Sequence, residues 1–361
     1  MPTRAAIRAE AARLRALIEA EGAAVVETPV LQPANLLLDL YGEDIRARAY
    51  VTSDALRGEQ MLRPDFTVPV VQMHMDHGAE PARYTYAGEV FRRQEEDPDR
   101  ASEYTQVGYE LFSRDAPEAA DAEVFSFIFN TLKPLGLRAS TGDIGILTAA
   151  VVGLNTTERR KQALMRHIWR PRRFRSLIDR FSGRAAVPDS RTALLARADP
   201  MGGATPLIGL RGLDEILSRI NALREDAVAD PISAGEVELL DAILSVRQTS
   251  QYALEHLRDI AVDMPAISEA VARLERRLSA LDARGIDVSA LDFEASYGRT
   301  QMEYYDGFVF GFYAENRPDL PAVASGGRYD ALTRRLGQGR EIPAVGGVIR
   351  PGLVLELGGL V

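Results

Sequence analysis

Two runs of alternating apolar and polar residues stand out in the first third of the chain, at 84–93 and 103–112. Alternation with a period of two, in segments rich in aromatic and β-branched residues, predicts β-strands. The residues between them, 94–100, are mostly acidic or basic with one proline and have no periodicity of their own. The two runs are therefore predicted to pair as a hairpin.

One face of this hairpin carries polar side chains. In the second run Tyr104, Gln106, Gly108 and Glu110 share a face, and the glycine leaves room beside its neighbours. Arg92, near the end of the first run, can oppose them across the pair. A carboxylate, an amide and a guanidinium together suit a small zwitterion with a carboxylate at one end and an ammonium at the other. The alternative is a two-sided sheet whose polar face meets water.

Other patterns place the hairpin in a larger fold. An amphipathic helix is predicted at 4–21, with Ile7, Leu14 and Leu17 on one side and Gly22 at its end. A short strand at 24–27, a turn-bearing segment at 50–60, a helix at 117–135 and a strand at 137–147 follow in the sequence. This order predicts an α+β fold on an antiparallel sheet.

The middle of the chain has a different character. From about residue 148 the pattern is helix after helix, with clear periodicity at 213–223, 234–245 and 267–281. Strand-like segments return at 304–313 and 324–330. We therefore predict a core in two parts, 1–147 and 286–361, that flank a mainly helical insertion at 148–285.

The composition is that of an ordinary globular protein. The 361 residues are 46% hydrophobic and 26% charged, which is enough for one large core or two domains. A net charge of −9 disfavours a protein whose whole surface binds nucleic acid. No cysteine is present, so disulfides, thiolate metal sites and cysteine nucleophiles are excluded. The sequence has no apolar signal core and no membrane-spanning run, and we expect a cytoplasmic protein.

One strongly basic segment, 159–175, interrupts this acidic chain. Such a run raises the hypothesis of RNA binding. Apolar residues are interleaved in it at roughly helical spacing, at Leu164, Ile168, Trp169, Phe174, Leu177 and Ile178. This spacing favours helices with a solvated basic face, and on an acidic chain a basic patch could equally meet an acidic protein partner.

The hairpin resembles motif 2 of the class II aminoacyl-tRNA synthetases in its histidyl version. In that family an arginine ends the first strand, and a glutamine and a glutamate on the second strand hold the amino acid. The segment 61–69 is similar to the family's Leu-Arg-Pro-Glu-Gly-Thr, with Asp65 in place of the glutamate and Thr67 kept. The resemblance implies that Asp65 and Thr67 meet the α-ammonium of the substrate. The alternative without a binding role is a surface ion pair between Arg63 and Asp65.

Further segments extend the resemblance along the chain. The helix and strand that precede Pro29 are similar to motif 1, which builds the dimer interface in that family. The segments 304–313 and 324–330 resemble the signatures Arg-Gly-Leu-Asp-Tyr-Tyr and Ala-Gly-Gly-Arg-Tyr-Asp. A histidine site is therefore implied at Asp65, Thr67, Arg92, Gln106, Glu110, Tyr304, Tyr305, Gly326 and Gly327. His74 and His77 have no third ligand nearby and are expected to be structural or solvated, so no metal is predicted.

Departures from the synthetase pattern carry the functional hypothesis. Thr300 stands where the family's Arg-Gly-Leu-Asp-Tyr-Tyr signature begins with arginine. Arg299 is one residue away, and on a strand its side chain would point to the opposite face. Leu353 stands near the arginine of motif 3, and Pro351 is expected to disturb the helix there. Arg350 offers a substitute only in a different register. Because the sequence stops soon after motif 3, we expect the family's anticodon-binding domain to be absent.

Adenylate formation needs fixed positive charges at the transferring phosphoryl group, and two of these are missing. The amino-acid side of the pocket is kept. This combination resembles the ATP phosphoribosyltransferase regulatory subunits, which are synthetase paralogues of histidine biosynthesis. The resemblance implies a non-catalytic chain, without cofactor, that binds L-histidine and transmits feedback inhibition.

The same resemblance implies partners and leaves two alternatives open. A short-form ATP phosphoribosyltransferase catalytic subunit is the expected partner, with this chain as a homodimer inside a hetero-oligomer, and neither a membrane nor tRNA is expected. One alternative is a truncated amino-acid-activating ligase that uses Arg299 or Arg350. The other is an RNA-binding regulator that uses the segment 159–175.

Overall fold

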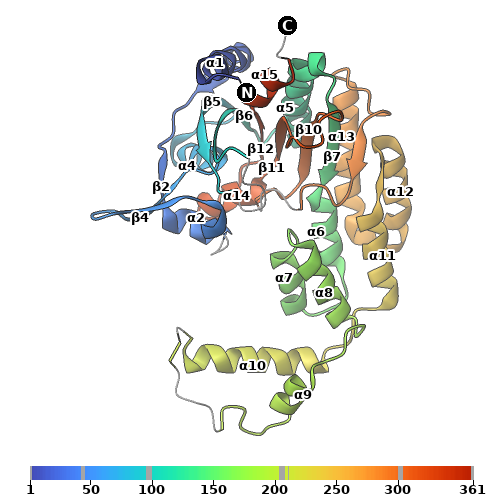
Figure 1. Cartoon of the computed structure of the whole chain (residues 1–361). Helices are drawn as coiled ribbons and strands as arrows, with labels where there is room; N and C mark the ends of the chain where they lie inside the picture. The colour runs from blue at the N-terminus through green and yellow to red at the C-terminus, as the bar shows by residue number, and fades with distance from the viewer. Residues whose placement is uncertain are drawn as a thin grey trace.

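A large mixed β-sheet forms the centre of the molecule (Figure 1). The structure is a computed structural model that describes residues 2–41, 45–94, 100–202, 208–209, 211–299 and 304–358. Within these ranges nine strands pair side by side in the order β1 (Ala24–Val25), β5 (Ala82–Phe91), β6 (Glu103–Phe112), β12 (Ala344–Ile349), β11 (Ala324–Arg328), β10 (Phe308–Tyr313), β7 (Arg138–Asp143), β9 (Asp292–Glu294) and β8 (Arg247–Thr249). Only β1 with β5 and β7 with β9 run parallel, so the predicted α+β fold is confirmed.

The predicted hairpin is formed by β5 and β6, which pair antiparallel along ten residues each. Odd-numbered side chains of β6 face helix α5 (Pro117–Leu132), where the hydroxyl of Tyr109 donates to Glu123 at 2.6 Å. Successive side chains of a strand point to opposite faces. The even-numbered residues of β6 therefore share the other face, as the alternation predicted.

Helix α5 covers the neighbouring strands through aromatic side chains. The ring of Phe125 lies 5.3–6.0 Å from the rings of Phe308, Phe310 and Phe312 on β10. Helix α13 (Ser268–Asp282) packs against α5. Burial of this aromatic layer is a large part of the hydrophobic stabilisation of the core.

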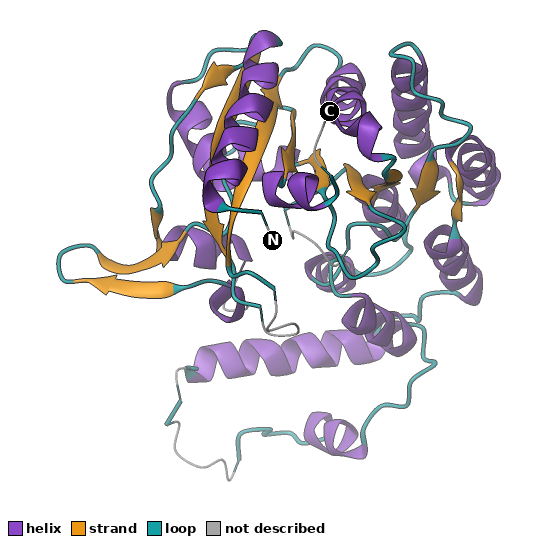
Figure 2. Ribbon diagram, turned by 45° about the horizontal axis from the view of Figure 1, so that its top comes forward, coloured by secondary structure: helices purple, strands orange, loops and turns teal. Residues whose placement is uncertain are grey.

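Smaller elements enclose the opposite side of the hairpin. Helices α4 (Thr67–His77) and α14 (Asp330–Leu336) pack against each other there. Helix α1 (Arg4–Ala20) instead lies on the face that α5 covers, where Arg4 and Arg8 pair with the odd-numbered Glu103 and Glu89, and it also packs on α15 (Pro351–Glu356). A three-stranded sheet of β2 (Leu31–Pro33), β4 (Gly58–Leu62) and β3 (Val51–Asp54) projects from the body beside α2 (Ala34–Tyr41) and α3 (Ile45–Arg48) (Figures 1 and 2).

The region after β7 is helical, as predicted. It contains α6 (Ile144–Gly153), α7 (Glu158–Arg166), α8 (Pro171–Phe181), α9 (Asp189–Leu195), α10 (Leu213–Val228), α11 (Ala234–Ser245), α12 (Ser250–Asp263) and α13. Figure 1 shows α7 and α8 between the sheet and the outlying α9 and α10. None of the helices in the described ranges is long and apolar enough to cross a bilayer. The domain limits themselves remain a prediction.

Several predicted element limits were wrong. The strand predicted at 137–147 ends at Asp143, because its carboxylate accepts from the backbone N–H of Gly145 at 2.8 Å and starts α6. The strand predicted at 304–313 begins only at Phe308. Pro351 begins α15 instead of disturbing it, since the first helical position has no hydrogen bond to lose. On α1, Ile18 is buried in place of Leu17, which is 39% exposed.

Candidate ligand-binding site

The carboxylate of Glu110 is the centre of the polar face of the hairpin. Its side chain is only 1% exposed. One carboxylate oxygen, Oε1, accepts from the hydroxyls of Thr67 at 3.0 Å and Tyr86 at 2.8 Å, and Oε2 accepts from the hydroxyl of Tyr329 at 2.5 Å. These donors come from the start of α4, from β5 and from the residue after β11. Three separate parts of the chain therefore converge on one carboxylate.

Burial raises the pKa of Glu110 to about 7. The hydroxyls of Tyr329, Tyr86 and Thr67 act in the opposite direction, because they donate to the ionised form, and the charge of Asp65 raises the pKa further. Near neutral pH this carboxyl group is therefore present in both its protonated and its ionised form. A cationic ligand group beside it would favour the ionised form.

Two glycines make the space that these side chains occupy. A Cβ atom on Gly108 would lie 2.0 Å from Cζ of Tyr86, and a Cβ atom on Gly346 would lie 1.5 Å from Oε2 of Glu110. Gly346 is paired directly with Glu110 across β12 and β6. The room predicted beside Gly108 is thus taken by the ring of Tyr86, which stacks on Phe66 at 4.2 Å.

The turn before α4 supplies the second acid. Asp65 and Thr67 are both buried, and the carboxylate of Asp65 accepts from the N–H of Val68 at 3.3 Å. The alternative of a surface ion pair is wrong, because Arg63 is buried as well. Its guanidinium donates to the carbonyls of Thr28 at 2.7 Å and Glu89 at 2.8 Å.

Gln106 and Arg92 occupy the same face nearer the loop of the hairpin. Gln106 is buried, and its Oε1 has no hydrogen-bond partner among the described residues. Buried acceptors are normally satisfied, so this oxygen is open to a ligand N–H. Arg92 donates through Nε to the carbonyl of Pro64 at 2.7 Å, which fixes it beside the turn that carries Asp65. The water-facing alternative for this sheet is wrong, since Gln106 and Glu110 are both buried.

Three of the C-terminal residues of the predicted site, Tyr304, Tyr305 and Gly327, lie against one another. Tyr305 is buried, and burial raises the pKa of its hydroxyl, with the charge of Glu110 as the next cause. The ring of Tyr304 contacts those of Tyr305 at 4.8 Å and Tyr329 at 6.1 Å. A Cβ atom on Gly327 would lie 2.7 Å from Cδ1 of Tyr305. The glycine therefore leaves room for the ring of Tyr305.

Gly326, the other member of the pair, faces backbone and core. A Cβ atom there would lie 2.2 Å from the carbonyl oxygen of Gly346 and 2.4 Å from Cζ of Phe310. Its role in the structure is close packing between strands β11 and β12. Nothing in this geometry brings Gly326 to the carboxylate of Glu110.

Sequence reasoning missed two of the hydroxyl donors and one indole. Tyr86 could have been found from the hairpin register, because it pairs directly with Gly108. Tyr329 lies inside the quoted Gly-Gly-Arg-Tyr-Asp segment. Trp169, in the turn between α7 and α8, donates from Nε1 to the carbonyl of Tyr305 at 3.3 Å. No sequence signal connected that turn with the pocket.

Arg299 is held by the helical region. It is 4% exposed and donates through Nε to the carbonyl of Ile168 at 2.7 Å, with its guanidinium 4.9 Å from the ring centroid of Phe174. Burial lowers its pKa to about 10. Thr300 and the next three residues lie outside the described residues, so the predicted loss of an arginine there rests on the sequence.

Arg350 is held at the end of β12. Its Nη1 donates to the carbonyl of Ala322 at 2.8 Å, and its guanidinium lies 5.5 Å from the ring centroid of Tyr104. Burial lowers its pKa. Arg92 lies on the same ring at 6.0 Å, so the two cations share one aromatic neighbour.

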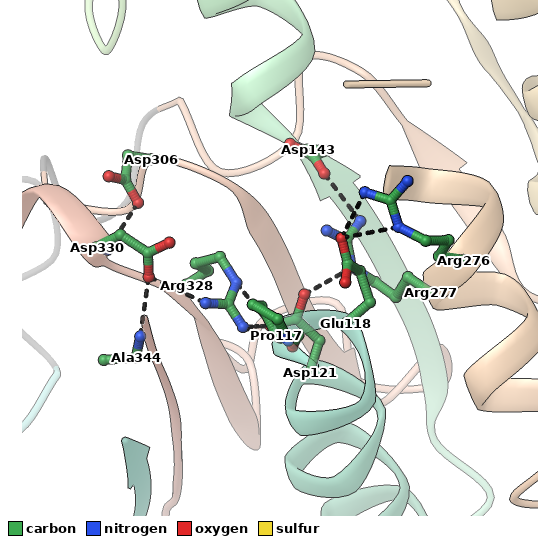
Figure 3. Close-up of polar contacts among 10 residues, drawn as sticks. All are labelled: Pro117, Glu118, Asp121, Asp143, Arg276, Arg277, Asp306, Arg328, Asp330 and Ala344. Atoms are coloured by element: carbon green, nitrogen blue, oxygen red, sulfur yellow. Dashed lines mark hydrogen bonds and ion pairs between the residues drawn. The ribbon is translucent and has the colours of Figure 1, made fainter. Parts of the chain in front are cut away.

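Behind the glycine pair lies a buried network of charges (Figure 3). Arg328 donates to Asp121 of α5 at 2.7 Å, and Arg277 of α13 donates to the other oxygen of Asp121 and to Asp143, both at 2.8 Å. All four side chains are buried. The network fixes the strand that carries Gly326 and Gly327 against α5 and α13.

Asp306 and Asp330 extend this network toward Tyr305. Asp306 accepts from the N–H groups of Asp330 at 3.0 Å and Ala331 at 2.6 Å, and Arg328 donates to Asp330 at 3.0 Å. Burial raises the pKa of Asp306 to about 7, and the neighbouring charge of Asp330 adds to this.

Helix α4, which follows the turn with Asp65, carries the two histidines His74 and His77. His74 is buried, stacks on Phe112 at 4.0 Å and lies 3.0 Å from the hydroxyl of Tyr84, so its predicted structural role is confirmed. The side chain of His77 lies outside the described residues. Where the structure describes the side chains, no cluster of three or more histidines and acids could hold a metal ion.

Known proteins similar to this chain agree with this architecture. The histidyl-tRNA synthetase family model matches residues 1–211 and 209–351. A solved ATP phosphoribosyltransferase regulatory subunit/histidyl-tRNA synthetase from Bacillus halodurans matches 98% of this chain and 79% of its own, with a TM-score of 0.68 and 21% identity. Histidyl-tRNA synthetase from Nostoc sp. PCC 7120 matches with a TM-score of 0.63 and 16% identity, over 98% of this chain and 73% of its own. The fold is thus of the class II synthetase type.

Sequence relatives are more specific. ATP phosphoribosyltransferase regulatory subunits from Brucella ovis and Brucella abortus are 31% identical to the chain and cover 92% of it, with 93% and 92% of their own lengths matched. Because the match extends along almost the whole of both proteins, the chain belongs to the family of ATP phosphoribosyltransferase regulatory subunits, whose fold is that of histidyl-tRNA synthetase.

Proposed function

We propose that this chain binds free L-histidine in the pocket around Glu110 and passes that signal to a short-form ATP phosphoribosyltransferase catalytic subunit. At the level of the family, the prediction of a non-catalytic regulatory subunit of histidine biosynthesis is confirmed by the relatives. The observation that carries the histidine proposal is the carboxylate of Glu110, buried under three hydroxyl donors on the strand face that also carries Gln106, whose Oε1 has no hydrogen-bond partner among the described residues.

The chemistry of this pocket suits each end of histidine. Asp65 and the open oxygen of Gln106 can accept from the α-ammonium, and Arg92 can pair with the α-carboxylate. Tyr305 and Glu110 can then hydrogen-bond the imidazole nitrogens. Every ligand group would replace its lost water contacts, which a buried polar ligand requires.

The absence of catalysis is supported by where two arginines are held. Arg299 donates to the carbonyl of Ile168, and Arg350 donates to that of Ala322. Stabilisation of a phosphoryl transition state needs positive groups fixed at the phosphate itself. Arginines directed at backbone carbonyls do not meet this need, which weighs against the truncated ligase.

Feedback inhibition by histidine requires unequal affinities. Histidine can inhibit only if it binds the inactive state of the assembly more tightly than the active one. The proposed site includes residues from the hairpin, from the start of α4 and from Tyr305, whose carbonyl accepts from Trp169 in the helical region. A change in any of these contacts is a route by which bound histidine could bias the assembly.

We also propose that two copies of the chain associate through the segment that resembles motif 1. Apolar side chains are exposed along and beside it, at Val25, Val30, Leu31, Tyr50 and Val51. Exposed large apolar side chains gathered in neighbouring segments are typical of protein interfaces. The dimer would then form part of a hetero-oligomer with the catalytic subunit.

The decisive experiment is calorimetric titration of the purified chain with L-histidine, with and without ATP. We expect saturable binding of histidine that ATP does not alter. The Gln106→Leu variant should bind at least about tenfold more weakly, because it removes one charge-assisted hydrogen bond. Gln248→Leu, at an exposed position of β8, serves as the matched control.

Two results would contradict the proposal. The first is failure of histidine to bind both the isolated chain and its assembly with the catalytic subunit. The second is exchange of pyrophosphate into ATP that depends on histidine, since a non-catalytic subunit forms no adenylate. Histidine-sensitive activity of the assembled catalytic subunit is the expected result.

A further inference from the structure

Three arginines flank the turn between α7 and α8, and no acid among the described residues pairs with them. Arg166 ends α7, and Arg172 and Arg173 lie in the first turn of α8. All three side chains are exposed, and none makes an ion pair or a side-chain hydrogen bond with any described residue. We call these three residues the arginine patch.

Neighbouring arginines of the same helices are treated differently. Arg160 and Arg180 both pair with Asp226 of α10, at 2.7 and 2.6 Å, and Arg175 pairs with Asp241 of α11 at 2.6 Å. The fold thus supplies acids for the basic residues that face α10 and α11. Among the described residues no acid pairs with the arginine patch, so the two sides of the basic segment differ in their surroundings.

The position of the patch on α8 is unfavourable for the helix itself. The N-terminus of a helix carries partial positive charge, and acidic residues are stabilising there. The first turn of α8 contains no acidic residue and instead contains Arg172 and Arg173. Arg299 adds a buried guanidinium 4.9 Å from the ring centroid of Phe174, in the same turn, and its Nη2 has no hydrogen-bond partner among the described residues. Positive charge accumulates here on a chain of net charge −9.

The residues that connect the two helices touch the pocket. Trp169 donates to the carbonyl of Tyr305, and the carbonyl of Ile168 accepts from Arg299. Whatever binds the arginine patch therefore acts on a turn that is already bonded to Tyr305. Figure 1 shows this helix pair between the sheet and α10.

We propose that the arginine patch is the docking surface for a carboxylate-rich face of the catalytic subunit. The inference rests on the proposed function and adds the surface by which the partner is recognised. Arginine forks bind carboxylates in defined geometry, and arginine is enriched at protein interfaces. Docking and histidine binding would then act on the same turn from its two sides, which gives their energetic coupling a physical route.

Nucleic acid fits this surface less well. Single-stranded nucleic acids bind proteins through basic grooves with aromatic side chains on which bases stack. The aromatic residues beside the patch are already engaged, because Trp169 bonds to Tyr305 and Phe174 is buried under Arg299. The net negative charge of the chain also opposes the approach of a polyanion.

The test reverses the charge of the patch in the triple variant Arg166→Glu, Arg172→Glu and Arg173→Glu. We expect its affinity for the short catalytic subunit, measured by surface plasmon resonance, to fall about tenfold or more, because like charges then face each other. Affinity of the unaltered chain should weaken steeply with added salt, and that of the variant should not. Histidine affinity of the isolated variant should stay unchanged.

A matched control separates this effect from net charge. The variant Arg219→Glu, Arg247→Glu and Arg258→Glu makes the same charge change at exposed positions outside the patch and outside the motif 1 segment. It should bind the catalytic subunit like the unaltered chain. Equal affinities of the patch variant and the control variant would overturn the docking surface while the proposed function stands.

Two other outcomes also decide the matter. If the unaltered chain binds histidine but never the catalytic subunit, the docking inference and the partner proposal fail together. If the patch variant keeps its affinity for the catalytic subunit and loses affinity for a tRNA probe, the patch is a nucleic-acid surface and the docking inference is overturned. Circular dichroism of the patch variant is expected to match that of the unaltered chain, since glutamates suit the N-terminus of α8.

Discussion

At the scale of single residues, Glu110 is the centre of the polar cluster in which we propose that histidine binds. Its carboxylate is fixed by three hydroxyl donors but remains buried, and burial raises its pKa to about 7. The same group can thus be neutral in the empty pocket and ionised beside a cation. Ligand binding and proton release are linked through this one residue.

We therefore predict proton release when histidine binds. An ammonium or imidazolium group beside Glu110 would lower its pKa, so that about one proton is released at pH 6 and almost none at pH 8. The measurement is titration calorimetry at both pH values in buffers of different ionisation enthalpy. Because free histidine also titrates near pH 6, the Glu110→Gln variant provides the reference. Identical proton release by variant and unaltered chain would exclude this role for Glu110.

The same pKa affects the free energy of unfolding. The folded chain keeps the Glu110 proton up to about pH 7, whereas the unfolded chain loses it near the ordinary value of 4.5. The contribution of Glu110 to stability is therefore fully present below that ordinary value and is lost as pH rises through about 7. Glu110→Gln should remove this part of the pH dependence in urea unfolding experiments.

The residue scale also shows what alternation could and could not predict. The even positions of β6 share a buried face because side chains alternate along a strand, and that was readable from the sequence. The identity of the hydroxyls around Glu110 was not, since Tyr86 and Tyr329 reach it only through strand register and a turn after β11. Contacts between distant segments depend on the packed fold.

At the scale of elements, the buried charge network joins the glycine strand β11 to α5 and α13. Arg277 provides both links to Asp121 and Asp143, and its side chain is fully enclosed. Removal of one partner from a buried ionic group leaves the remaining charge without compensation. Asp143 also starts α6, so its environment affects where the helical region begins.

Arg277→Met should lower the free energy of unfolding by about 3 kcal/mol or more, because Asp143 would be left buried with no cation. The adjacent Arg276 pairs with Glu118 and Glu269 at the surface and gives a matched control. Arg276→Met should change the free energy by about 0.5 kcal/mol or less. Urea unfolding of both variants measures the difference, and similar losses would mean that the network is not a stabilising unit.

Element boundaries failed in the sequence prediction where local bonds decided them. Strand β7 ends at Asp143, four residues before the predicted end, because the carboxylate of Asp143 caps helix α6. The apolar residues that follow suit a strand and a helix equally, so periodicity alone did not locate this boundary. Pro351 was read as a helix breaker, although the first position of a helix tolerates proline. Periodicity identified the type of each element, and side-chain caps determined its limits.

At the scale of the whole molecule, the fold belongs to a synthetase family, but its charges are arranged for a different use. Arg299 and Arg350 bond to backbone carbonyls, and the arginine patch faces outward. The resemblance of the sequence predicted the family and the regulatory class, which the relatives confirm. The surfaces for partners were not predictable, because exposure depends on how distant elements pack.

The dimer proposed for the motif 1 segment can be tested at this scale. Exposed apolar side chains at Val25 and Leu31 would face a second copy, and two glutamates there would place charges in a desolvated interface. We expect the double variant Val25→Glu and Leu31→Glu to be monomeric in sedimentation experiments at concentrations where the unaltered chain is dimeric.

The control for this variant uses apolar residues that are even more exposed. Val228 ends α10 and Val262 lies on α12, with exposed fractions of 86% and 77%. The double variant Val228→Glu and Val262→Glu adds the same charge and should remain dimeric. If both variants remain dimeric, the interface lies elsewhere. If only the Val25→Glu and Leu31→Glu variant is monomeric, the motif 1 segment forms the interface, and each dimer contains two histidine sites. Histidine bound to one copy could then affect the other, since both pockets would share that interface.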